Sequence, residues 1–262
     1  MKPGTITLIG AFLKDMTRQK AIIFSCFILP VVIIWSTWWV TADFPMLFRL
    51  DNGQEIAASM IDVHVITGGL MAMAITAGLF AFIITSENQK IADRLKLAGY
   101  SPRSITLGTL LALLTVLAGA MVIAVLLVFS LYQPEDNVGV LLAVILVTLV
   151  YAALGNLLGT VYPKVMEGTL LILFVSFLDL MLLTNPMGEG LYLEPWTYFL
   201  PGFWTVQLAL EAGFLGEPAD LVMQTSMVII YVLVLLLLVQ LAKSSVFQRM
   251  VLLLPLGTSD AL

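Results

Sequence analysis

Long apolar runs separated by short polar segments make up most of this chain. Six runs come close to the about 20 residues that a helix needs to cross the hydrocarbon core of a bilayer. The polar segments between them are too short to fold by themselves, so residues 1–262 are predicted to form a single all-α transmembrane domain. The predicted spans are residues 21–40, 67–86, 105–132, 138–161, 168–184 and 226–243.

An amphipathic helix is predicted before the first span, in residues 5–19. Apolar side chains recur there at helical spacing and polar side chains lie on the opposite side, which is typical of an interfacial helix along the cytoplasmic membrane surface. The alternative is a frayed extension of the first span. The apolar positions are Ile9, Phe12, Leu13 and Met16, and the polar positions are Thr7, Lys14 and Arg18.

Two outer segments carry further predictions. Residues 41–66 contain the turn signal Asp51-Asn52-Gly53, which favours a short helix and a turn. Residues 185–225 contain an apolar stretch that is broken at Pro201-Gly202 and is too short to cross, so it is predicted to be re-entrant or interfacial. Its aromatic side chains are expected at headgroup level, as a structural belt or for handling a lipid-like substrate. They belong to Trp196, Tyr198, Phe203 and Trp204.

Composition agrees with a membrane protein, and charge orients it. Of the 262 residues, 60% are hydrophobic and 11% are charged, and the mean hydropathy is +1.04, outside the range of soluble domains. With the N-terminus in the cytoplasm, eleven of the twelve Lys and Arg residues fall on the cytoplasmic side and only Arg49 falls outside, where eleven acidic residues collect. The positive-inside rule then predicts an even number of spans with both termini in the cytoplasm.

The residues that most enzymes need in an active site are scarce. The chain has one histidine, His64, and one cysteine, Cys26, and it contains no His-Glu-x-x-His, no paired cysteines and no Gly-x-Ser-x-Gly. The nucleotide-binding loop Gly-x-x-x-x-Gly-Lys-Ser/Thr is also missing. We therefore expect no catalytic site, no metal and no cofactor on this chain. His64 is expected to be a solvated loop residue, with metal binding or pH sensing as the alternative.

Two features inside the predicted spans are candidates for a role beyond crossing the membrane. Gly155 and Gly159 form a small-xxx-small face, which favours close helix packing within the chain or in a dimer. Asp179 is an ionisable residue near the outer end of the fifth span, and such residues are functional candidates by default. The alternatives for Asp179 are snorkelling to the outer surface or capping a neighbouring helix.

Residues 87–104 carry a local helical pattern between the second and third spans. Ser86 and Gln89 fit a capping box, and Gly99 is a natural helix stop. A solvated loop would explain the basic residues of this segment but not its apolar face. We therefore predict a cytoplasmic helix that docks against a partner. The apolar face consists of Ile91, Leu95 and Ala98.

The arrangement as a whole resembles the permease subunits of type-2 ABC transporters, the exporters of drugs, lipids and polysaccharides. The likeness extends over the whole chain: an amphipathic N-terminal helix, six spans, a basic helix that starts at Glu87, and a re-entrant region before the last span. The stretch LAGYSPRSI, residues 97–105, also looks like the family's segment leading into the third span. Many members have Glu-Arg-x-x-Gly-Thr where this chain has Glu87-Asn88-Gln89, which leaves the subfamily and the substrate open.

The resemblance implies a transport subunit of the plasma membrane, not an enzyme. In such permeases residues 87–104 would be the coupling helix, held in a groove of an ABC ATPase subunit that is present in two copies and carries the ATP and Mg²⁺. A second permease chain, identical or homologous, would complete the pathway, the bilayer would surround it, and no nucleic acid is expected. The residues expected to serve ATPase coupling are Glu87, Ile91, Arg94, Leu95, Lys96 and Leu97.

Export of an apolar or amphipathic substrate is the function that the resemblance favours. Aliphatic, methionine-rich spans suit such a substrate, although methionine is also common in membrane cores. The alternative is a non-transporting membrane sensor or assembly factor that binds its cytoplasmic partner through 87–104. A secondary carrier ranks lower because the chain lacks an inverted repeat and charged midplane sites.

Overall fold

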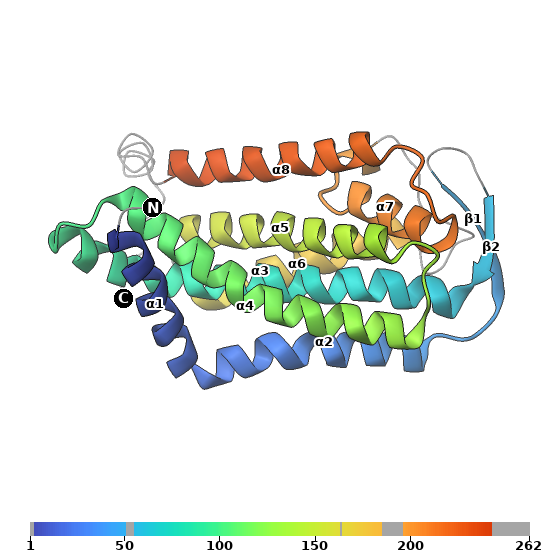
Figure 1. The fold of residues 1–262 in the computed structure, drawn as a ribbon, viewed down its shortest axis with the longest axis horizontal. Coiled ribbons are helices and arrows are strands. Elements are labelled where there is room, and N and C mark those ends of the chain that lie inside the picture. The colour runs from blue at the N-terminus through green and yellow to red at the C-terminus, as the bar shows by residue number, and fades with distance from the viewer. Residues whose placement is uncertain (1–2, 51–54, 163, 185–195, 243–262) are drawn as a thin grey trace, which may run out of the picture.

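A computed structural model of the chain describes residues 3–50, 55–162, 164–184 and 196–242 (Figure 1). Most of them are helical, and five of the described helices are long and apolar enough to cross a membrane. Those five are α2 (Lys20–Val40), α3 (Met60–Leu97), α4 (Pro102–Leu131), α5 (Asn137–Val161) and α8 (Leu221–Ala242). The other elements are α1 (Pro3–Arg18), β1 (Pro45–Arg49), β2 (Glu55–Ser59), α6 (Val165–Thr184), the short 3₁₀ helix η1 (Thr197–Phe199) and α7 (Phe203–Phe214).

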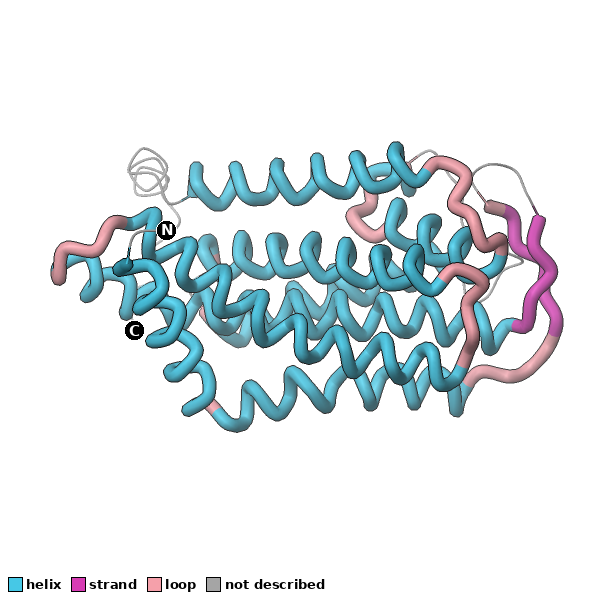
Figure 2. Tube along the Cα trace, in the orientation of Figure 1, coloured by secondary structure: helices cyan, strands magenta, loops and turns pink. Residues whose placement is uncertain are grey.

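The long helices lie side by side in one bundle. Helix α1 and the turn between α3 and α4 lie at one end of the bundle, and the two strands and α7 lie at the other, as Figure 2 also shows. In chain order, the six predicted spans correspond to α2, α3, α4, α5, α6 and α8.

Helix α3 is the centre of the bundle, and it packs against α2, α4, α5, α6 and α7. Its closest partner is α5, because Gly155 and Gly159 of α5 lie directly on the α3 backbone. A Cβ at Gly155 would lie 2.2 Å from the Gly78 carbonyl oxygen, and one at Gly159 would lie 2.7 Å from the Phe82 carbonyl oxygen. The small-residue face therefore serves packing between two helices of the same chain.

The second span and the predicted coupling helix are one continuous helix of 38 residues, α3. The predicted capping box is wrong, because Ser86 lies inside α3 and its hydroxyl donates to the Ile83 carbonyl. The predicted stop at Gly99 is present: Gly99 has a φ of +86°, and the Tyr100 N–H donates to the Leu95 carbonyl at 3.1 Å. This is the Schellman ending that glycine favours. Ser101 then caps α4, accepting from the Ser104 N–H.

Helix α1 is held to the bundle by its apolar stripe. Leu8, Phe12 and Met16 are buried, and α1 packs mainly against α4. The contact is close at Gly108 of α4, where a Cβ would lie 3.2 Å from the Leu8 side chain. Ile9 and Leu13 are only half-buried. The amphipathic pattern is therefore used first for packing within the chain.

The segment between the first two spans differs from the prediction, because it forms an antiparallel hairpin of β1 and β2 instead of a short helix. Pro45 pairs with Ser59 and Arg49 with Glu55. Asn52-Gly53 is a strong hairpin-turn signal, although residues 51–54 lie outside the described ranges. The fold is mostly helical, as predicted, and this small sheet is an addition to the helical bundle.

The region before α8 is broken at Pro201-Gly202, with η1 on one side and α7 on the other. Twelve residues of α7 extend about 18 Å at 1.5 Å per residue, too short for a hydrocarbon core of about 30 Å. The prediction for two of the aromatic residues is wrong: Phe203 and Trp204 are buried against other helices, so they face protein and not lipid headgroups. Trp196 is exposed. Residues 185–195 lie outside the described ranges.

Candidate functional site

The carboxyl-terminal tip of α3 is the first candidate site, and it lies at the end of the bundle that also holds α1 (Figure 1). Leu97 is 89% exposed, and Arg94 is exposed one turn earlier. Residues three apart on a helix share a face, so Arg94 and Leu97 together form an exposed surface with one cation and one large apolar side chain. Glu87 is exposed further back along the helix.

The other predicted coupling residues lie differently. Ile91 and Leu95 are half-buried and pack against the hydrophobic core of this chain. They attach the end of α3 to the bundle, so they present less surface to a partner than the sequence predicts. The side chain of Lys96 lies outside the described residues.

The amino-terminal end of α7 meets the predicted intramembrane residue Asp179. Asp179 is buried on α6, and its Oδ2 atom accepts from the Gly202 N–H at 2.9 Å and from the Tyr151 hydroxyl of α5. Gly202 is the residue that precedes α7, so the carboxylate lies where the helix dipole favours negative charge. Asp179 therefore caps a neighbouring helix and joins α5, α6 and α7.

The space around Gly202 is closed by the same contact. A Cβ at Gly202 would lie 2.7 Å from the Leu180 side chain and 3.1 Å from Asp179 Oδ2. Only the absence of a side chain lets the α7 backbone approach α6 so closely.

The carboxyl-terminal end of α7 is bound by the connection between α4 and α5. The Glu135 N–H donates to the Gly213 carbonyl at 3.0 Å, and the Asp136 N–H donates to the Ala212 carbonyl at 2.9 Å. The Tyr132 hydroxyl also donates to the Gly213 carbonyl, at 2.9 Å.

A second buried carboxylate, Glu211, lies near this end of α7. It is 2% exposed, and its Oε2 atom accepts from the Gln224 side-chain amide and from the Ala219 N–H, both at 2.9 Å. Glu211 thereby attaches α7 to the loop that leads into α8 and to α8 itself. Both ends of α7 are thus satisfied by tertiary partners, as a buried helix requires.

Sequence reasoning identified Asp179 but missed Tyr151, Glu211 and Gln224. For Glu211 a signal was available, because an ionisable residue in an apolar stretch is a candidate by default. For Tyr151 and Gln224 no signal was available, because only the tertiary structure brings them to the carboxylates.

No group of three His, Cys, Asp or Glu side chains that could hold a metal ion occurs in the part of the chain that the structure describes. His64 lies near the start of α3, where its Nδ1 atom is 3.1 Å from the Thr41 hydroxyl. Cys26 is a buried free thiol.

Comparison with known proteins places the chain in a family. A family model described as ABC-2 family transporter protein matches residues 47–241, which are 195 of the 262 residues. A search of curated protein sequences finds no match. The matched segment includes α3 with its exposed tip, both ends of α7 and nearly all of α8. The chain therefore belongs to the ABC-2 transporter family and is a multi-pass membrane permease component of an ABC transporter.

Proposed function

We propose that this chain is the membrane-spanning subunit of an ATP-driven exporter that moves an apolar or amphipathic substrate out of the cytoplasm. Membership of the ABC-2 transporter family supports the transport class. In this proposal α6, which has 20 residues, crosses the membrane together with the five apolar helices, and both termini lie in the cytoplasm. A separate ATPase subunit in two copies supplies the energy, and a second permease chain completes the pathway.

The exposure of the α3 tip is the main support for a role in coupling to the ATPase. At 1.5 Å per residue, the 38 residues of α3 extend about 57 Å, well beyond the hydrocarbon core of about 30 Å. The tip therefore lies outside the bilayer with Arg94 and Leu97 presented to a partner, while the rest of α3 contacts most of the bundle.

A continuous helix gives this coupling a mechanical basis. Movement of the ATPase against the tip is transmitted along α3 without an intervening hinge, and α5 moves with α3 because Gly155 and Gly159 bring the two backbones together. Such contacts shift the transport equilibrium only if they differ in free energy between the inward-facing and outward-facing states.

Leu97→Asp tests this function. The chain is co-expressed with an ATPase subunit encoded beside it, and complex formation and substrate-stimulated ATP hydrolysis are measured. We expect at least about tenfold weaker association, because a charge replaces an apolar contact, with no loss of folding since Leu97 is 89% exposed in the free chain.

Met166→Asp is the matched control, because Met166 is 78% exposed at the start of α6 and is not part of the α3 tip. It should assemble normally. Normal association and transport by Leu97→Asp would contradict the coupling role. Assembly with a kinase or another regulator, and none with the ATPase, would instead favour a non-transporting sensor.

A further inference from the structure

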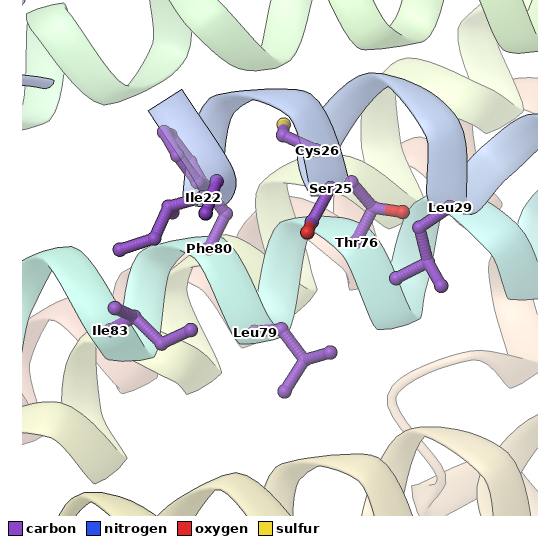
Figure 3. A pocket seen from close by; sticks show the side chains of 9 residues that line it. Ile22, Ser25, Cys26, Leu29, Thr76, Leu79, Phe80 and Ile83 are labelled. Carbon is purple, nitrogen blue, oxygen red and sulfur yellow. The ribbon is translucent and has the colours of Figure 1, made fainter. Parts of the chain in front are cut away.

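A partly open groove lies between α2 and α3 and has a volume of about 180 Å³ (Figure 3). Its walls are mainly aliphatic and include Leu29 of α2 and Leu79 and Ile83 of α3. An engineered apolar cavity of about 150 Å³ holds benzene. The groove is therefore large enough for one small ring or a short branched chain.

Two hydroxyl groups face this apolar space. Ser25 extends from α2 toward α3, and Thr76 extends from α3 toward α2, as Figure 3 shows. Thr76 is 2% exposed, and its Oγ1 atom has no hydrogen-bond partner among the described residues. An unpaired hydroxyl in an apolar setting is costly, which makes it a strong partner for a ligand that can bond it.

Other hydroxyl groups of α2 and α3 donate hydrogen bonds to backbone carbonyls of their own helix. The Ser36 hydroxyl in α2 donates to the Ile33 carbonyl, and the Thr67 hydroxyl in α3 donates to the Val63 carbonyl, both at 2.9 Å. This backbone bond is the usual solution for Ser and Thr in a helix. Within the described residues the Thr76 hydroxyl does not make it, and both Thr76 and Ser25 line the groove.

We propose that the groove binds the exported molecule, and that this molecule is a small neutral compound with an apolar ring or chain and one hydroxyl or carbonyl group. The apolar walls hold the hydrocarbon part, and Ser25 and Thr76 bond its oxygen. A charged group is excluded, because none of the nine residues that line the groove is charged.

The position of the groove fits loading from the inner half of the membrane. It lies along residues 21–29, the first half of α2, and residues 76–83 of α3. With the N-terminus in the cytoplasm, these segments occupy the cytoplasmic half of the bilayer, so this step rests on the proposed function. An apolar alcohol that has partitioned into the inner leaflet would reach the groove through its open side.

Photolabelling of the purified full chain, without an ATPase, tests the site. The probe is 4-(trifluoromethyldiazirinyl)benzyl alcohol, compared with the analogue that carries a methyl group in place of the hydroxymethyl group. We expect labelled peptides from α2 and α3, with half-saturation at a three- to tenfold lower concentration for the alcohol, since one net hydrogen bond separates the two probes.

Substitutions in α2 and α3 test which hydroxyl groups bind the alcohol probe. Thr76→Val and Ser25→Ala should each remove most of the alcohol's advantage, whereas the matched controls Thr67→Val and Ser36→Ala should keep it. Ser25 is exposed, so Ser25→Ala retains the fold and keeps the test valid even where Thr76→Val disturbs folding.

Absence of α2 and α3 labelling would overturn the proposal. Equal labelling by the two probes would also overturn it, because the groove would then accept hydrocarbon of any kind, including lipid chains. These outcomes are independent of ATPase binding, which Leu97→Asp examines, so failure of the groove and failure of the proposed function are distinguishable.

Discussion

Helices α5 and α8 have the same mean hydropathy but opposite surroundings. In the apolar 18-residue segment of α5, 67% of the residues are buried inside the chain. In the corresponding segment of α8, 17% are buried. Helix α5 carries glycines and alanines on its inner faces, with Gly155 on the α3 backbone, whereas α8 is rich in large aliphatic residues such as Leu233 and Leu237. In lipid, small residues and not overall hydropathy decide which helix becomes the core.

Polar contacts also distinguish the buried helix α5 from the peripheral helix α8. Tyr151 of α5 is fully buried and bonds Asp179. Helix α8 is bound in its first turn by Gln224, which donates to Glu211, and near its middle by the Tyr231 hydroxyl, which donates to the Tyr198 carbonyl at 3.2 Å. The two helices therefore differ in how far the rest of the fold depends on them, and substitutions can test that difference.

Gly155→Ala should have the largest effect. The added Cβ would meet the Gly78 carbonyl oxygen at 2.2 Å, and a backbone atom cannot move aside without separating α3 from α5. We expect a loss of about 3 kcal/mol, at the upper end of overpacking costs, or failure to fold. Thermal unfolding in detergent, followed by tryptophan fluorescence, measures it.

Gly10→Ala in α1 is the control, because a Cβ there meets no atom within 4 Å and alanine is the better helix former. It should be neutral or slightly stabilising. A Gly155→Ala protein as stable as the unsubstituted chain would show that α3 and α5 are not rigidly packed.

Asp179→Ala should have the next largest effect. It leaves the Tyr151 hydroxyl and the Gly202 N–H buried without their acceptor, at about 1–3 kcal/mol for each. Asp179→Asn keeps an acceptor oxygen and should cost clearly less. Chemical denaturation of the three proteins gives the order, and equal stabilities for Ala and Asn would contradict the capping role.

Gln224→Leu should have a smaller and local effect. It removes the side-chain amide that donates to the buried Glu211 carboxylate, at the junction of α7 with α8. Hydrogen exchange should become faster in the first turns of α8, while α5 stays protected. Met227→Leu, at a half-exposed position of the same helix, is the control. Faster exchange throughout α5 would mean that the two helices are not independent.

Leu237→Ala should have the smallest effect. Leu237 is 59% exposed, so its truncation leaves no cavity inside the chain, and the change in unfolding temperature should be close to zero. A loss as large as that of a core leucine would show that another protein surface, such as the second permease chain, covers this face of α8.

Much of the fold could be predicted because long apolar runs leave a membrane chain few options. Local signals also located the stop at Gly99 and the break at Pro201-Gly202. The capping box at Ser86 failed because its residues equally suit a helix interior, and nothing nearby interrupts α3. The hairpin was missed although Asn52-Gly53 signals one, because the flanking runs are short.

The candidate sites were predicted less completely. The apolar stripe of Ile91 and Leu95 has the same sequence pattern whether it contacts a partner or its own chain. In the structure Ile91 and Leu95 pack against the core of this chain, and Leu97 is exposed. Asp179 was found because a lone carboxylate in an apolar run is conspicuous. The partners of Asp179 were not predicted, because Tyr151 and Gly202 lie far from it in the sequence.

The sequence by itself determined that this is a membrane protein and where its long apolar runs lie, because hydropathy acts residue by residue. Only the tertiary structure decided that α5 is core and α8 is periphery, that α7 is bound at both ends, and that Ser25 and Thr76 face one groove. Those properties depend on which backbones can approach one another, and a linear pattern does not contain that information.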